Sequence, residues 1–299
     1  MKKGLVFFAL CLATLNLFSQ EWISCFQQNP AAPEVKLMSD TEQKTELLFT
    51  IGGFFKKEVN TPKGLQYVIT VPKMASMLEK GSPDLPLYAI PVLIDDMAAM
   101  EVQVKETKFQ DFENIEIAPS KGNFSREIDP DDVPFSYGDA YYHDRFFPCF
   151  QAQLDQPYIL RDFRGQNILV YPFAYNPITK TLRVYTQLTL TMRKTGEKGD
   201  NPRLSRKSNQ MKLSPEADAL YQHRFVNYRN KVSKYSFIPD QGEMLVICPD
   251  QYTDAMQPFV AWKNKSGRPT IMVSLSDIGG NDTDHAQDRR ERRQPKTDP

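Results

Sequence analysis

The side chains of this sequence that could form a nucleophile and base pair are three histidines and four cysteines. Catalysis of that kind needs the two groups within hydrogen-bond reach of each other. His143 and Cys149 lie six residues apart, but the segment between them is aromatic-rich and ends in a proline. A turn that packs against a core explains such a segment better than catalysis does. His223 falls in a predicted helix and His285 in a polar tail.

The remaining chemical signatures are also missing from the sequence. No pair of cysteines has zinc-ligand spacing, and no glycine-rich phosphate loop, nucleophile elbow or paired-carboxylate motif is found. We therefore predict no catalytic residue, no metal site and no cofactor for this chain.

Composition places the chain among ordinary globular proteins. Its 299 residues are 40% hydrophobic and 25% charged, which suits two domains of about 150 residues each. Lysine plus arginine and aspartate plus glutamate both number 37. Because this balance leaves no basic excess, we expect neither nucleic acid nor an anionic membrane as a partner.

The N-terminus has the pattern of a secretory signal peptide, which we assign to residues 1–19. Two lysines precede the uncharged apolar run Leu5–Leu15, and Leu17–Ser19 is an acceptable cleavage motif. The run is too short to span a bilayer. We expect an exported protein that is periplasmic, cell-surface or extracellular. Its mature form would keep an odd number of cysteines, so a disulfide framework is not predicted. Those cysteines are Cys25, Cys149 and Cys248.

Short apolar segments separated by glycine and proline dominate from Glu46 to Arg193. This pattern is typical of an antiparallel β-sandwich or barrel. The strands predicted from apolar alternation are 47–51, 65–71, 100–107, 166–171 and 181–191. We expect the last two to form a hairpin through residues 176–181.

Two further segments are predicted before the next domain. Residues 195–213 are polar and contain glycines, which indicates a linker. Residues 214–228 should form a helix, because Ser214 can cap it and Pro215 suits its first position.

The segment after residue 242 has the order strand, helix, strand. The strands are expected at 243–248 and 269–275, and the helix at 253–265 with Phe259, Val260 and Trp262 on its buried face. This is the first unit of a parallel α/β sheet, and such sheets need cover on both faces. Residues 279–299 are polar and are predicted to be disordered. We therefore expect an α/β domain that is truncated early.

Two sets of residues resemble the gingipain family of secreted bacterial cysteine endopeptidases, peptidase family C25. The first set resembles the family's β-rich N-terminal propeptide and comprises residues 81–86, 90–91, 117–122, 141–148, 170–177 and 182–185. The second resembles the first strand and helix of the caspase-like mature domain and comprises 244–247, Tyr252, Asp254, 259–264 and Gly267.

The resemblance implies a precursor with an inhibitory, folding-assisting propeptide at residues 20–234. Residues 235–278 would begin the catalytic domain, and cleavage would fall between Lys234 and Tyr235. The family's catalytic histidine and cysteine and its calcium sites lie beyond these residues, so this chain is expected to be inactive alone. The implied partner is a C25 catalytic domain, in cis or in trans.

One residue is a candidate for the inhibitory contact. Arg126 lies in a polar, proline-bounded loop, and members of this family prefer arginine or lysine. We hypothesise that Arg126 fills the specificity pocket of the peptidase; the alternative is an ordinary surface arginine. Two other functions stay open for the chain as a whole: a stand-alone β-domain inhibitor or chaperone acting in trans, and an adhesin-like β-sandwich.

Overall fold

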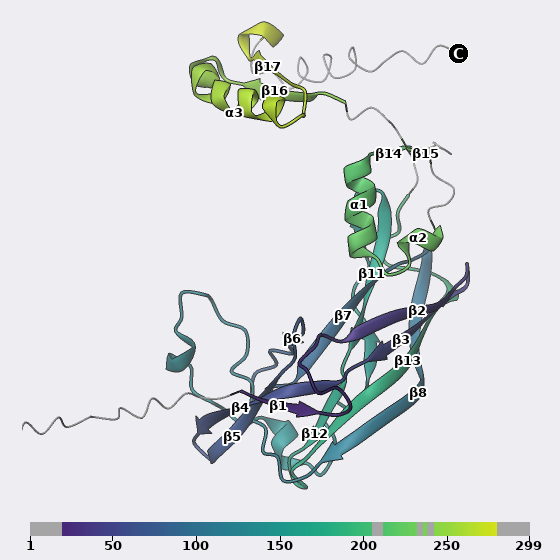
Figure 1. Ribbon diagram of the computed structural model, residues 1–299, viewed down its shortest axis with the longest axis vertical. Coiled ribbons are helices and arrows are strands. Elements are labelled where there is room, and N and C mark those ends of the chain that lie inside the picture. Colours follow the sequence, from purple (N-terminus) through teal and green to yellow (C-terminus); the bar gives the residue numbers. More distant parts are fainter. Residues whose placement is uncertain (1–19, 205–211, 232–235, 238–241, 280–299) are drawn as a thin grey trace, which may run out of the picture. The chain divides into compact units, whose positions relative to one another are not determined.

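The computed structural model describes residues 20–204, 212–231, 236–237 and 242–279. The chain divides into two compact units, whose boundaries fall near residues 207, 220 and 233. Figure 1 shows that the first unit holds nearly all of the strands. Among the described residues, no helix is both long and apolar enough to cross a membrane.

Three antiparallel sheets build the first unit. The first sheet has the order β1 (Glu21–Ser24), β4 (Gly53–Thr61), β5 (Gly64–Thr70). The second has the order β10 (Tyr158–Leu160), β11 (Phe163–Val170), β7 (Pro86–Leu93), β6 (Ala75–Ser76), and β9 (Ala152–Leu154) also pairs with β11. The third has the order β12 (Phe173–Asn176), β13 (Thr181–Lys198), β3 (Lys44–Thr50), β2 (Glu34–Asp40), and β8 (Ala98–Phe112) also pairs with β13. The predicted mainly antiparallel β fold is therefore confirmed.

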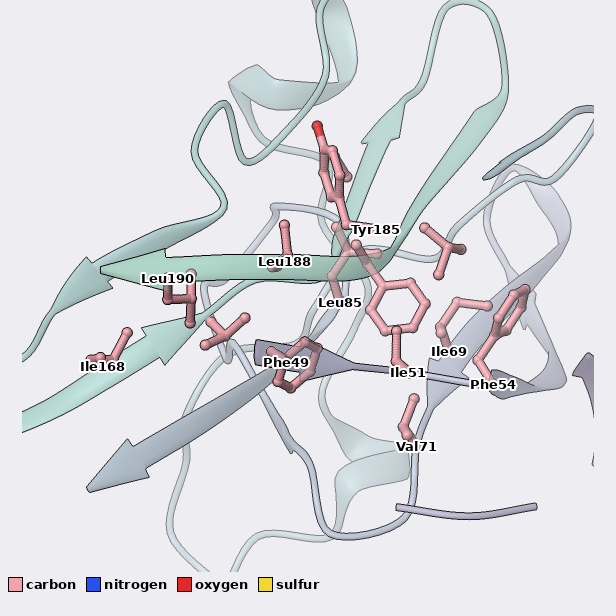
Figure 2. Packing of buried hydrophobic residues seen from close by; sticks show 14 of the residues in the cluster. Phe49, Ile51, Phe54, Ile69, Val71, Leu85, Ile168, Tyr185, Leu188 and Leu190 are labelled. Carbon is pink, nitrogen blue, oxygen red and sulfur yellow. The ribbon is translucent and has the colours of Figure 1, made fainter. Parts of the chain in front are cut away.

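The core lies between these sheets and follows the alternation of their strands (Figure 2). On β13 the side chains of Leu182, Val184, Leu188 and Leu190 are fully buried, as a period of two requires when one face is covered. They share one cluster with apolar residues of β3, β7 and β11. Each fully buried leucine or valine contributes about 1.5–3 kcal/mol relative to an exposed one.

The predicted hairpin has the right turn but the wrong first strand. Residues 166–171 belong to β11, which pairs with β7 and β10, whereas β12 is the strand that pairs with β13. The chain changes sheet at Tyr171-Pro172, between β11 and β12. Asn176 forms the turn, since its Oδ1 accepts hydrogen bonds from the backbone N–H groups of Ile178 and Thr179.

The predicted linker also begins later than residue 195. Strand β13 continues to Lys198, and the next residues are held by the turn between β7 and β8. The N–H of Gly199 donates to the carbonyl of Met97 at 2.8 Å, and the Arg203 N–H donates to the carbonyl of Asp96 at 2.9 Å. Residues 199–203, which we call the strap, are therefore an ordered part of the first unit. Residues 205–211 lie outside the described part of the chain.

The predicted helix at 214–228 is shorter than expected. Helix α1 (Pro215–Arg224) ends four residues early, and α2 (Tyr228–Lys231) follows it. The break is tertiary in origin: the Val226 N–H donates to the carbonyl of Pro91, and the buried Asn227 side chain pairs with the backbone of Leu93 on β7. The predicted cap is present, because Ser214 Oγ accepts from the N–H of Ala217 at 3.3 Å.

The second unit contains the predicted strand, helix, strand order. Strands β16 (Met244–Cys248) and β17 (Thr270–Ser274) pair in parallel, and α3 (Thr253–Lys265) connects them. The short parallel pair β14 (Lys212–Leu213) and β15 (Ser236–Phe237) also belongs to this unit. Of the three residues expected on the buried face of α3, Phe259 and Val260 are half-buried, whereas Trp262 is 58% exposed, and no α3 residue is fully buried. Two five-residue strands present too little area to cover a helix of 13 residues.

Four short 3₁₀ helices complete the described structure. They are η1 (Pro130–Asp132), η2 (Asp139–Tyr142), η3 (Asp250–Tyr252) and η4 (Ser276–Ile278).

Candidate functional site: a braced arginine loop

A long connection between the isolated bridge at Pro119 and helix η2 carries the candidate residue Arg126. We call residues 121–137 of this connection the Arg126 loop. Arg126 is exposed and occupies the second position of a β-turn. The Ile128 N–H donates to the carbonyl of Ser125 at 3.1 Å, and Ser125 Oγ accepts from the Glu127 N–H at 3.3 Å. The turn therefore projects a basic side chain into solvent from a defined backbone.

Lys121 braces the loop across its interior. Its ammonium donates to the carbonyl of Pro130 at 2.6 Å and lies 4.5 Å from the centre of the Phe135 ring. Both contacts are favourable for a cation, the first by a charge-assisted hydrogen bond and the second by cation–π attraction. Helix η1 begins at Pro130, where Asp129 Oδ1 accepts from the N–H of Asp131 at 2.9 Å. The brace thus links the start of the loop to its second half.

Tyrosines fix the C-terminal end of the loop on the β4–β5 hairpin. The Tyr137 hydroxyl lies 2.6 Å from Gln66 Oε1 and 2.9 Å from Thr61 Oγ1. Lys63, in the hairpin turn, places its ammonium 4.0 Å from the centre of the Tyr137 ring. Tyr141, just beyond the loop, donates to the carbonyl of Ile117 at 2.8 Å. Burial raises the pKa of Tyr141, with smaller contributions from nearby charges and tyrosines.

A groove of about 770 Å³ lies between the loop and strands β4 and β5. Phe124 and Phe135 line it on the loop side, and Val59 and Val68 line it on the sheet side. Asp84 also lines the groove, and partial burial raises the pKa of its carboxyl group, although a hydrogen bond from Ser76 opposes that shift. Between Lys121 and Phe135 the loop therefore passes over the groove, and it contacts the β4–β5 hairpin at Tyr137.

The residues first considered for catalysis do not form a catalytic pair in the described structure. His143 Nε2 is 3.0 Å from Asp139 Oδ1, on an exposed surface, and the contacts described for the histidine do not include Cys149. The described cysteines are all free thiols, and burial raises the pKa of Cys25 to about 11. Within the described ranges, no cluster of three or more metal-ligating side chains is present. The arrangement can present a cation to a partner; it does not supply a nucleophile and base.

The other predicted site residues, Lys234 and Tyr235, lie outside the described residues. Sequence reasoning proposed Arg126 but did not identify its supports, Lys121 and Tyr137. Tyr137 has partners distant in sequence, such as Gln66, so the loop carries no local signal for that contact. Lys121 has its partners within the loop, at Pro130 and Phe135, but no motif marks a contact across nine or more residues.

Comparison with known proteins identifies a matching family model and sequence relatives. The family model Propeptide_C25 matches residues 26–216. Gingipain R1 of Porphyromonas gingivalis is 37% identical over 249 residues, which cover 82% of this chain and 24% of that protein. Gingipain R2 of strain W83 is 36% identical over 248 residues, 82% of this chain and 33% of the relative. The chain thus spans a third or less of the length of these relatives.

Solved structures agree with the sequence relatives. A chain in the complex of the pro- and mature domains of Porphyromonas gingivalis RgpB superposes with a TM-score of 0.59 at 35% identity. The match covers 65% of this chain and 97% of that one. A structure on the zymogenic latency of gingipain K from the same organism matches with a TM-score of 0.51 at 19% identity, which supports the fold alone.

Proposed function

Because this chain belongs to the C25 propeptide family, we propose that its first unit is an inhibitory and folding-assisting propeptide for a gingipain-like cysteine endopeptidase. The partner is the catalytic domain of such a peptidase, joined in one precursor or acting in trans. The observation that carries this proposal is the exposed Arg126 on a braced turn.

Arg126 has the chemistry of a substrate-like plug. A guanidinium forms paired, charge-assisted hydrogen bonds with a carboxylate, which is how a pocket selective for basic side chains would hold it. Peptides that bind by strand addition are extended. The Arg126–Glu127 peptide bond is instead the central bond of a hydrogen-bonded turn. The side chain can therefore occupy a specificity pocket while the bond that follows it is withheld from the nucleophile.

The second unit is consistent with a propeptide that is followed directly by a catalytic domain. We propose that residues 235–278 begin that domain, with β16, α3 and β17 as its first parallel unit. Leu245 on β16 and Ile271 on β17 are paired in register, and each is 37% exposed. Parallel sheets normally have both faces covered, so these apolar side chains are suited to further packing.

Inhibition in trans tests the proposed function directly. The purified chain is expected to inhibit peptide hydrolysis by the mature domain of gingipain R1 and to co-elute with it in gel filtration. The physical reason is the burial of the Arg126 loop in the cleft of the enzyme. If the chain at micromolar concentration neither inhibits the enzyme nor forms a complex with it, the propeptide function is refuted.

We further propose that Lys234-Tyr235 is the processing site and that residues 1–19 direct export. Incubation with the mature domain of Lys-gingipain should release a fragment that begins at Tyr235, and Lys234→Ala should abolish that fragment. Arg229→Ala, which removes a nearby exposed basic residue, serves as the control and should leave the cut unchanged. Mass spectrometry of the products identifies the site, and a different new N-terminus would refute it.

A further inference from the structure

Both ends of the Arg126 loop are hydrogen-bonded to one residue, Gly81. The Gly81 N–H donates to the carbonyl of Ser120 at 2.9 Å, just before the loop begins. The Gly81 carbonyl accepts from the N–H of Gly138 at 2.8 Å, just after the loop ends. Gly81 lies in the connection before β7, so it is far from both ends of the loop in sequence.

The two glycines approach each other so closely that a Cβ on either one would meet the backbone of the other. Gly81 has φ +82°, a conformation that side chains disfavour. A Cβ on Gly81 would lie 3.0 Å from the backbone nitrogen of Gly138 and 3.2 Å from its Cα. A Cβ on Gly138 would lie 3.2 Å from the Gly81 carbonyl oxygen. A Cβ at either position therefore requires the two backbones to separate by a few tenths of an ångström, which would lengthen the hydrogen bond from the Gly138 N–H to the Gly81 carbonyl.

The loop has few other attachments between its ends. No residue from 123 to 139 is fully buried, and the loop passes over the groove. Between the two ends its position depends on the Lys121 brace, the turn around Arg126 and the hydrogen bonds of the Tyr137 hydroxyl group on the β4–β5 hairpin. Because a loop of this length gains conformational freedom when its ends separate, the base of the loop controls how well Arg126 is placed.

We propose that Gly81 and Gly138 form a backbone latch that positions Arg126 for insertion into the peptidase, and that the two glycines act on inhibition through that side chain. This inference rests on the proposed function of the Arg126 loop. The glycines are positioning residues and do not themselves contact the partner's pocket.

Substitution at the latch, with a matched glycine as control, tests the proposal. In the full chain, Gly81→Ala and Gly138→Ala should each weaken inhibition of the gingipain R1 mature domain by about 10-fold, since misplacement of a binding group forfeits pre-organisation. Amide hydrogen exchange within 121–137 should accelerate in both variants. Gly196→Ala is the control, because Gly196 has a similar φ of +86° but open space around it. It should change inhibition by less than about 2-fold.

A double-mutant cycle separates positioning from general damage. If the latch acts through Arg126, adding Gly81→Ala to Arg126→Ala should cost less than about 2-fold in inhibition. A full 10-fold additional loss would overturn the proposal, and so would unchanged inhibition or unchanged exchange in both glycine variants. Gly138→Ala is the variant less prone to misfold, because φ at Gly138 is −88°, a value that alanine adopts without strain. A loss of inhibition in this variant is therefore not explained by backbone strain at the substituted residue. If Arg126→Ala itself leaves inhibition unchanged, the proposed plug fails, while exchange still reports whether the latch holds the loop.

Discussion

Replacing Arg126 by alanine is expected to weaken inhibition of the gingipain R1 mature domain by about 30- to 1,000-fold, or about 2–4 kcal/mol, as for a central anchor of an interface. The guanidinium is exposed in the free chain, so it is available to a partner and contributes little to the fold. The midpoint of urea unfolding should therefore stay the same. Inhibition constants measured from peptide hydrolysis are the readout.

Two companion variants identify what Arg126 does. Arg145→Ala removes the same charge from an exposed arginine that is 3.7 Å from Asp139, and it should leave inhibition nearly unchanged. Arg126→Lys keeps the charge but loses the paired geometry of the guanidinium, so its loss should be intermediate if the pocket is selective for arginine. An Arg126→Ala inhibition constant equal to that of the unmodified chain would refute the plug.

Replacing Arg164 by methionine is expected to lower the free energy of unfolding of the first unit by about 3–5 kcal/mol. Arg164 on β11 is 1% exposed, and its guanidinium donates to four backbone carbonyls. One belongs to Asp95 in the β7–β8 turn and one to Ala98 at the start of β8. The other two belong to the strap, at Asp200 and Asn201. Methionine fills similar space but donates nothing, so it leaves these acceptors without their partner.

The same variant should release the strap. Burial lowers the pKa of Arg164, and the neighbouring carboxylates partly restore it. Urea denaturation measures the loss of stability, and hydrogen exchange of residues 199–203 measures the local effect. Arg161→Ala is the matched control, since Arg161 is an exposed residue in the turn between β10 and β11 and its contact with Asp162 is 3.7 Å long. It should cost less than about 0.5 kcal/mol. Equal unfolding midpoints for Arg164→Met and Arg161→Ala would contradict the clamp.

The family match bears on the functions that the sequence left open. The propeptide model covers most of the β-rich unit, which favours the propeptide over an adhesin-like sandwich. A stand-alone inhibitor and a precursor segment share the same contact surface, so the Arg126 experiments apply to both. The parallel unit of β16, α3 and β17 was predicted from its pattern and is present in the structure.

The local sequence pattern was sufficient to predict features that are set by residues close together in the chain. Alternation along β13 indicated the buried side chains of Leu182, Val184, Leu188 and Leu190, because a strand exposes successive residues to opposite faces. Ser214 and the helix of the parallel unit were predicted for the same reason, since caps and helical periods are set within a few residues. Arg126 was proposed from the polar, proline-bounded composition of its loop and from the basic preference of the family that the chain resembles, and its inhibitory role stays a prediction.

What depended on distant parts of the chain could not be predicted. The pairing of β11 with β7, the end of α1 at Arg224 and the exposure of Trp262 all depend on contacts with distant segments of the chain. The amino-acid sequence by itself determined the short strands, the turns, the helix caps and a basic loop. Only the tertiary structure decided that Gly81 closes that loop and that Arg164 holds the strap. Those hydrogen bonds join segments that are distant in sequence, and no local pattern predicts such pairs.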